Sequence, residues 1–148
     1  MSGEDESDTE LVAEMEPLGR GECLDLLATA SVGRVGLLVD GLPEILPVNY
    51  ALDGETVLFR TAEGTVLTQA SMEVVAFEVD RIDEIDQSGW SVLVQGVAHD
   101  IGDAIDHTSE RLRRLTLVTW APGTRQRWVR ISPGKITGRR IRVLPTEL

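Results

Sequence analysis

The stretch from Arg34 to Thr61, RVGLLVDGLPEILPVNYALDGETVLFRT, decides the predicted fold. Its apolar runs are separated by two Asp-Gly pairs, Asp40-Gly41 and Asp53-Gly54. An Asp-Gly pair between apolar runs is typical of a hairpin, because both central residues of a type I′ turn need a positive φ. The stretch therefore predicts three consecutive antiparallel strands joined by tight turns.

The flanking segments extend these strands into a mainly β fold. Apolar residues at three- and four-residue steps predict a helix over about Gly21–Ala30, with Cys23 on its buried side. Two further helical segments are expected, one over about Thr65–Ser71 and one after Gly102. More strands are predicted over Val74–Ile82, Trp90–His99, Arg125–Ile131 and Lys135–Val143, the last two separated by a turn at Ser132-Pro133-Gly134. Short antiparallel strands with edge helices predict a closed or nearly closed β-barrel, because closure removes exposed strand edges.

Charge is distributed unevenly along the 148 residues. The run Ser2–Glu16 carries seven acidic residues and no basic one, so we expect residues 1–16 to form a disordered acidic tail and residues 17–148 to form one domain. Residues 1–110 hold 24 acidic and 4 basic residues, whereas residues 111–142 hold 10 basic and no acidic ones. Two interpretations stay open for the basic strands: they pair with the acidic strands around Glu73–Asp86, or they line a site for an anionic ligand.

Composition argues against several classes of function. A net charge of -11 disfavours nucleic acid as a partner. No apolar run approaches the roughly 18 to 20 residues that span a bilayer, and the N-terminus is acidic, so we expect a cytoplasmic protein with no membrane partner. The single cysteine, Cys23, cannot form an intramolecular disulfide, and His99 and His107 have no third ligand at metal spacing, so no metal site is predicted. Redox chemistry would need a bound cofactor.

Three stretches together resemble the pyridoxamine 5'-phosphate oxidase-like flavoproteins, in particular their small, unspecialised branch. They are Cys23–Leu27 with Ser31–Val35; Leu46–Tyr50 with Asp53-Gly54, Phe59–Thr61 and Gly64-Thr65; and Val75–Asp80 with Gly89–Gly96, Trp128–Ile131 and Ile136–Ile141. The resemblance covers about residues 17–144. It implies a six-stranded antiparallel split β-barrel that forms a homodimer and binds FMN in the groove between its subunits.

The resemblance also implies that both subunits contribute to the flavin site. One wall is the stretch from Pro47 to Leu67, and the residues implied to run beneath the isoalloxazine ring are Val48, Asn49 and Tyr50. The residues implied to approach the ribityl phosphate are Arg60, Thr61 and Thr65. The other subunit is implied to supply Trp90 and Ser91, and the site is closed by the region from Trp128 to Arg139. A flavin needs an apolar slot, donors at its polar edge and positive charge or hydroxyls at its phosphate, and these residue types provide all three.

One departure from the family pattern concerns the phosphate. Family members usually carry one or two basic residues just after the Gly-Thr pair, where this chain has Val66 and Leu67. Losing a charge-assisted contact to a phosphate lowers affinity by about one to two decades. Compensation by the C-terminal arginines and replacement of FMN by FAD or a deazaflavin are therefore open alternatives.

The leading functional hypothesis is a flavin-dependent oxidoreductase that acts on a small molecule the sequence does not identify, with no catalytic acid or base assigned. Pyridoxamine phosphate is not the expected substrate, because the terminus Ile136–Ile141 lacks the histidine-containing motif of the true oxidases. The alternatives are a protein that holds a flavin or another anionic ligand without turnover, and a cofactor-free dimer.

Overall fold

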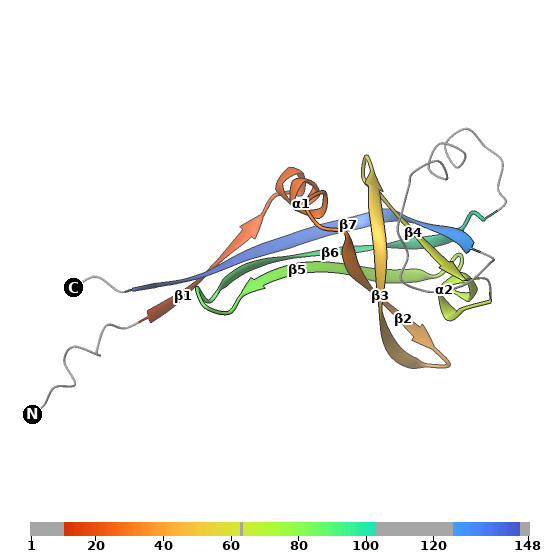
Figure 1. Cartoon of the computed structure of the whole chain (residues 1–148), viewed down its shortest axis with the longest axis horizontal. Helices are drawn as coiled ribbons and strands as arrows, with labels where there is room; N and C mark the ends of the chain where they lie inside the picture. Colours follow the sequence, from red (N-terminus) through yellow and green to blue (C-terminus); the bar gives the residue numbers. More distant parts are fainter. Residues whose placement is uncertain (1–10, 63, 103–125, 146–148) are drawn as a thin grey trace, which may run out of the picture.

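The computed structural model describes residues 11–62, 64–102 and 126–145, and its strands form one antiparallel sheet (Figure 1). The strands are β1 (Leu11–Leu18), β2 (Val32–Val39), β3 (Leu42–Asp53), β4 (Thr56–Ala62), β5 (Val74–Asp83), β6 (Ser88–Asp100) and β7 (Gln126–Pro145). They lie in the order β1-β7-β4-β3-β2-β5-β6, and β6 also pairs with β7. Strands β2 to β7 thus close into a six-stranded barrel, while β1 pairs with the C-terminal part of β7. The split-barrel prediction is confirmed.

Alternation along the strands separates a packed inner face from an outer face. In β5 the buried side chains are Val75, Phe77 and Val79, and those between them are half-buried. This period of two is what a strand with one face on a core requires. The rings of Phe77 and Tyr50 meet edge to face, with centroids 4.9 Å apart. We call the side of the sheet opposite this core the outer face.

The hairpin predicted at Asp40-Gly41 is confirmed. Asp40 has φ 51° and Gly41 has φ 79°, so both central residues are left-handed, as a type I′ turn needs. Two short helices complete the described fold: α1 (Arg20–Leu27) and α2 (Val66–Gln69). In Figure 1, α2 lies near β4 at one end, while β1 and the end of β7 project at the other.

The N-terminal segment enters the sheet earlier than predicted. Residues 11–16 were expected in a disordered tail, yet they belong to β1 and pair with β7. Opposite charges stabilise the pairing of β1 with β7, because Glu14 lies opposite Arg142 and Glu16 lies opposite Arg140. The carboxylate of Glu16 also forms a diagonal ion pair with the guanidinium of Arg142, at 3.1 Å. The basic strand therefore pairs with these acids and not with β5, which corrects the first interpretation of the charge pattern.

The C-terminal strands are continuous, and the turn predicted at Ser132-Pro133-Gly134 is wrong. Instead β7 runs from Gln126 to Pro145, and its register with β6 shifts between Gln95 and Gly96. A shift of this kind is a β-bulge, which absorbs one extra residue without reversing the chain. Gly96 is required there, because a Cβ at that position would lie 2.0 Å from the carbonyl oxygen of Ser132.

Three predictions fall outside the described residues: the helix after Gly102, the histidine His107 and the tail before residue 11. Within the described ranges, no helix is long and apolar enough to cross a bilayer.

Candidate functional site

The first group of predicted site residues gathers where β4 and β7 meet α2. Arg60 and Trp128 are partners in the ladder, and the guanidinium carbon of Arg60 lies 4.6 Å from the centroid of the Trp128 ring. Next along β4, the hydroxyl of the buried Thr61 is 3.0 Å from that of Thr65, the residue before α2. Arg60 and Trp128 lie on the outer face, whereas Thr61 alternates with Arg60 along β4 and points to the inner face, where its hydroxyl meets that of Thr65. We call Arg60, Thr61, Thr65 and Trp128 the Trp128 cluster.

The β3 wall contributes mainly packing. Val48 and Tyr50 belong to the main core, with Tyr50 only 3% exposed, whereas Pro47 is exposed and Asn49 half-buried. The Tyr50 hydroxyl donates to the carbonyl oxygen of Leu27 at 2.5 Å and its amide donates to that of Ser31 at 3.0 Å. Burial raises the pKa of Tyr50 to about 12, so the phenol stays a neutral donor. Tyr50 therefore anchors the barrel to the end of α1.

Val66 and Leu67 lie in α2 and face the barrel. Leu67 is 7% exposed within the core cluster, and Val66 packs against that cluster. These two positions consequently carry apolar packing, where the family pattern has cationic side chains for a phosphate.

The second group of predicted residues lies toward the other end of the ladder between β6 and β7. Ser91 pairs with Arg139, and both line a small cavity of about 200 Å³ together with Leu93, Thr137 and Gly138. We call Ser91, Leu93, Thr137 and Arg139 the Arg139 cluster. Because Trp90 alternates with Ser91, its ring points to the opposite, inner face.

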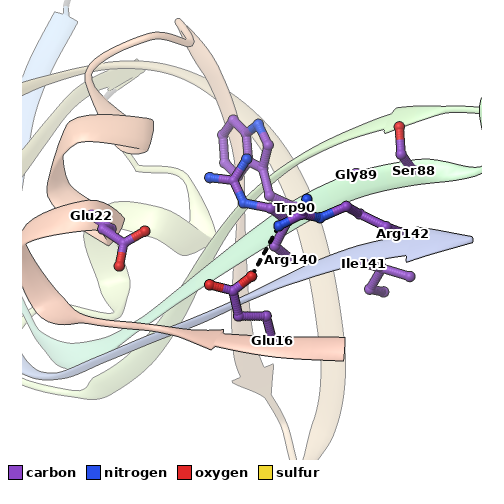
Figure 2. Close-up of a pocket in the computed structure, with 8 residues that line it drawn as sticks. All are labelled: Glu16, Glu22, Ser88, Gly89, Trp90, Arg140, Ile141 and Arg142. Carbon is purple, nitrogen blue, oxygen red and sulfur yellow. Dashed lines mark hydrogen bonds and ion pairs between the residues drawn. The ribbon is translucent and has the colours of Figure 1, made fainter. Parts of the chain in front are cut away.

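Trp90 lines a separate cavity of about 500 Å³ beneath α1 (Figure 2). Its other walls include Arg140 and Arg142 from β7, Glu16 from β1 and Glu22 from α1. Figure 2 shows the ion pair between Glu16 and Arg142 closing one side. Two predicted neighbours, Trp90 and Ser91, thus belong to different faces of the sheet.

Within one chain, the Trp128 cluster and the Arg139 cluster lie far apart. Trp128 and Arg139 are eleven positions apart on the same strand, β7, which corresponds to roughly 33 to 36 Å at about 3.3 Å per residue, depending on whether the residue absorbed by the bulge is counted. A ligand that touches both clusters would have to lie between two chains.

The outer face carries a charged triad that the sequence analysis did not single out. A guanidinium nitrogen of Arg34 on β2 lies 3.4 Å from the carboxylates of both Glu78 and Asp80 on β5. The pKa of Glu78 is raised to about 7, first by partial burial and then by the hydrogen bond and charge of Asp80, which together outweigh the lowering by Arg34. The sequence could have indicated the pair of carboxylates, because Glu78 and Asp80 are two residues apart on one predicted strand and therefore share a face.

Exposed apolar side chains lie beside this triad. Leu38 is 72%, Ile45 70% and Val74 72% exposed. Gly36 pairs with Ile45 on β3 and with Ala76 on β5, so these three residues share one face of the sheet. Leu38 is two residues from Gly36 and Val74 is two residues from Ala76, so strand alternation places both on that same outer face. The outer face of β2, β3 and β5 is therefore partly apolar and uncovered in the single chain.

Arg130, also on the outer face, is a further residue that the sequence analysis did not name. It lies opposite Leu58 on β4 and opposite His99 on β6. Its neighbour Trp128 forms a small apolar cluster with Leu58 and Ile101, separate from the main core. Among the residues that the structure describes, no hydrogen-bond partner is found for the buried Nε of Arg130.

The remaining candidates for chemistry in the described ranges are Cys23 and His99. Cys23 is fully buried on the inner side of α1, where desolvation raises the pKa of its thiol. His99 is half-buried on β6. In the described part of the chain, no three His, Cys, Asp or Glu side chains gather as a metal site would require.

The antiparallel ring of β2 to β7 with β1 appended defines a split-barrel protein of the pyridoxamine 5'-phosphate oxidase type. The model of the family described as pyridoxamine 5'-phosphate oxidase matches residues 19–140. This chain belongs to that family.

Similar proteins occur in several bacteria. A relative in Mycobacterium tuberculosis, Rv0080, is 36% identical over 134 residues, which are 86% of each chain. The structure of an FAD binding protein from Mycobacterium smegmatis is 40% identical with a TM-score of 0.71, covering 85% of this chain and 97% of that one. A protein of unknown function from Corynebacterium diphtheriae is 32% identical with a TM-score of 0.70, covering 84% and 96%.

Proposed function

We propose that this protein binds a flavin through the Trp128 cluster. The observation that carries the proposal is the stacking of Arg60 on Trp128 on the outer face, where β4 pairs with β7. This arrangement suits a flavin phosphate, because a guanidinium binds phosphate through charge-assisted hydrogen bonds and the buried Trp128 ring beneath holds it in place. A relative with 40% identity that is described as FAD binding supports the same assignment.

FMN and FAD are both candidates for the bound flavin. The family resemblance favours FMN, whereas the description of the Mycobacterium smegmatis relative favours FAD. Both share the isoalloxazine ring and a phosphate ester on the ribityl chain, so the residues assigned above would serve either one.

We further propose that the flavin lies in a groove between two copies of the chain. The Arg139 cluster of one copy would face the Trp128 cluster of the other, because the two clusters lie too far apart on β7 to share a flavin within one chain. The exposed Leu38, Ile45 and Val74 support a homodimer, since monomeric proteins rarely expose contiguous apolar patches of this kind.

The proposed activity is transfer of electrons or hydride between the flavin and a small molecule. A bound flavin would supply that redox chemistry through its ring, and the protein would orient it and limit its access to water. The same residues would also suit a carrier that holds the flavin without turnover, which is the second candidate function.

Titration of the purified chain with FMN and FAD tests flavin binding. We expect one of them to raise the melting temperature and to lose fluorescence on binding. Reduction of the bound flavin under anaerobic conditions, seen as bleaching near about 450 nm, separates the two functions. An enzyme accepts electrons from a nicotinamide or deazaflavin donor and passes them to an acceptor, whereas a carrier leaves the spectrum unchanged.

A further inference from the structure

Arg130, unlike Arg34, Arg127 and Arg142, has no carboxylate partner among the described residues. Arg127 contacts Asp100 at 2.9 Å, Arg142 contacts Glu16 at 3.1 Å and Arg34 contacts Glu78 at 3.4 Å. For Arg130 no ion pair occurs with any described residue, and its Nε is buried without a hydrogen bond there. A guanidinium keeps its charge and its five donors at all relevant pH values, so a buried unpaired donor of this kind favours an anionic ligand.

Arg130 lies next to the Trp128 cluster, two residues from Trp128 on β7. Residues 128 and 130 of one strand point to the same side, so Arg130 shares the outer face with the Trp128 ring. Across the ladder Arg130 faces Leu58, and Arg60 lies two residues further along β4, over the same ring. Arg60, across the ladder, and Arg130, two residues along β7, are thus both outer-face neighbours of Trp128.

The apolar positions on α2 leave a role for these arginines. Val66 and Leu67 pack on the core, so α2 offers no side-chain charge to a phosphate at the two positions where the family usually has it. Arginine suits phosphate particularly well, because its planar fork can make two parallel hydrogen bonds to phosphate oxygens.

We propose that Arg130, together with Arg60, binds the phosphate of the flavin and so replaces the missing basic side chains of α2. The inference rests on the proposed flavin site and adds a residue that discriminates phosphorylated flavins from riboflavin. The ligand chemistry is a flavin phosphate ester, whether the monophosphate of FMN or the diphosphate of FAD.

The test compares FMN with riboflavin, which has the same ring and ribityl chain but no phosphate. We expect the wild-type protein to bind FMN more tightly than riboflavin. Arg130→Gln should weaken FMN binding about tenfold while changing riboflavin affinity by less than about twofold, as loss of one charge-assisted contact predicts. Parallel titration of FAD distinguishes the two phosphate sources, because a larger loss for FAD than for FMN would assign Arg130 to the diphosphate.

Arg140→Gln is the matched control. Arg140 is another half-buried arginine of β7, but it lines the Trp90 cavity on the inner face, so its loss should leave the preference for FMN unchanged. Arg130→Lys replaces Arg130→Gln in the test if the glutamine variant does not fold. It keeps the charge but loses the planar fork, so we expect the affinity for FMN to fall about threefold and the affinity for riboflavin to stay unchanged.

Equal losses for FMN and riboflavin, or no loss for either, would overturn the role of Arg130 while leaving flavin binding intact. Failure of the wild-type protein to bind any of the three flavins would instead reject the proposed function, and the role of Arg130 with it.

Discussion

Arg60 lies over the ring of Trp128, with 4.6 Å between its guanidinium carbon and the ring centroid, where β4 pairs with β7. This contact joins two residues that are far apart in the sequence and assigned to the same site. Because a cation over an indole face is attracted by the ring quadrupole, the stacking also holds the Arg60 side chain in place. The contact therefore fixes the position of the Arg60 side chain within the single chain.

A double-mutant cycle measures this contact. Arg60→Gln and Trp128→Leu should each destabilise the protein, and the double variant should be less destabilised than the sum by about 0.5 to 1 kcal/mol. Urea unfolding of the four proteins provides the free energies. Strictly additive effects would show that the stacking contributes nothing to the folded state.

The triad of Arg34, Glu78 and Asp80 makes stability depend on pH. The pKa of Glu78 is raised from 4.5 to about 7, first by burial and then by Asp80. Between these two values the folded chain keeps a proton that the unfolded chain has released, so this group's contribution to stability falls as pH rises through that window. Glu78→Gln should therefore be more stable than wild type at pH 8, by about 1 kcal/mol because the side chain is still 34% exposed, and equal to it near pH 4.

Glu73→Gln is the control for this effect, since Glu73 is exposed just before β5 and outside the triad. It should shift stability little at either pH. Urea unfolding at pH 4, 6 and 8 gives the free energy of unfolding of each protein. If Glu78→Gln differs from wild type by the same free energy at all three pH values, the pKa of Glu78 is not raised.

Gly138 lies against Cys23 where β7 passes under α1. A Cβ at Gly138 would lie 2.7 Å from the Cys23 sulfur and 3.0 Å from the carbonyl oxygen of Ser91. Gly138→Ala should therefore destabilise the protein by about 1 to 3 kcal/mol through overpacking. Adding Cys23→Ala removes the sulfur and should recover part of that loss, which thermal or urea unfolding can measure. A double variant as unstable as the sum of the two changes would mean that the sulfur is not the obstacle.

The predicted hairpin and the buried side of α1 agree with the structure because both depend on local signals. At Asp40-Gly41 the two residue types themselves permit the positive φ angles that the turn adopts. Cys23 recurs with the apolar residues of a short helix, and it is fully buried. Neither prediction required knowledge of distant parts of the chain.

The errors concern interactions between distant residues. The acidic run that contains Glu16 resembles a disordered tail when considered alone, but it becomes a strand because Arg140 and Arg142 lie opposite it more than a hundred residues later. At Pro133, turn-forming residues sit in a continuous strand because Gly96 on β6 accommodates the bulge. The residues around each segment do not reveal the distant residues that pair with it.

For the candidate site, the sequence named individual residues, whereas their arrangement in space came only with the structure. The resemblance placed Arg60 and Trp128 in one site, and the structure stacks them. The separation of Trp90 from Ser91 onto two faces follows from strand alternation once the strand is known. Arg130 was not singled out from the other C-terminal arginines, because its lack of a hydrogen-bond partner at Nε among the described residues arises only from tertiary packing.

The two-chain groove is the central claim, and mixed dimers test it most directly. Arg60→Glu reverses a charge in the Trp128 cluster, and Arg139→Glu does so in the Arg139 cluster, so each variant alone should bind flavin poorly. Chains of the two variants, unfolded together and refolded, would form mixed dimers in which one groove keeps both native clusters and the other has neither. We expect flavin binding in the mixture to exceed that of either variant by an amount set by the share of mixed dimers. Binding no greater than the average of the two separate variants would contradict a groove built from both chains.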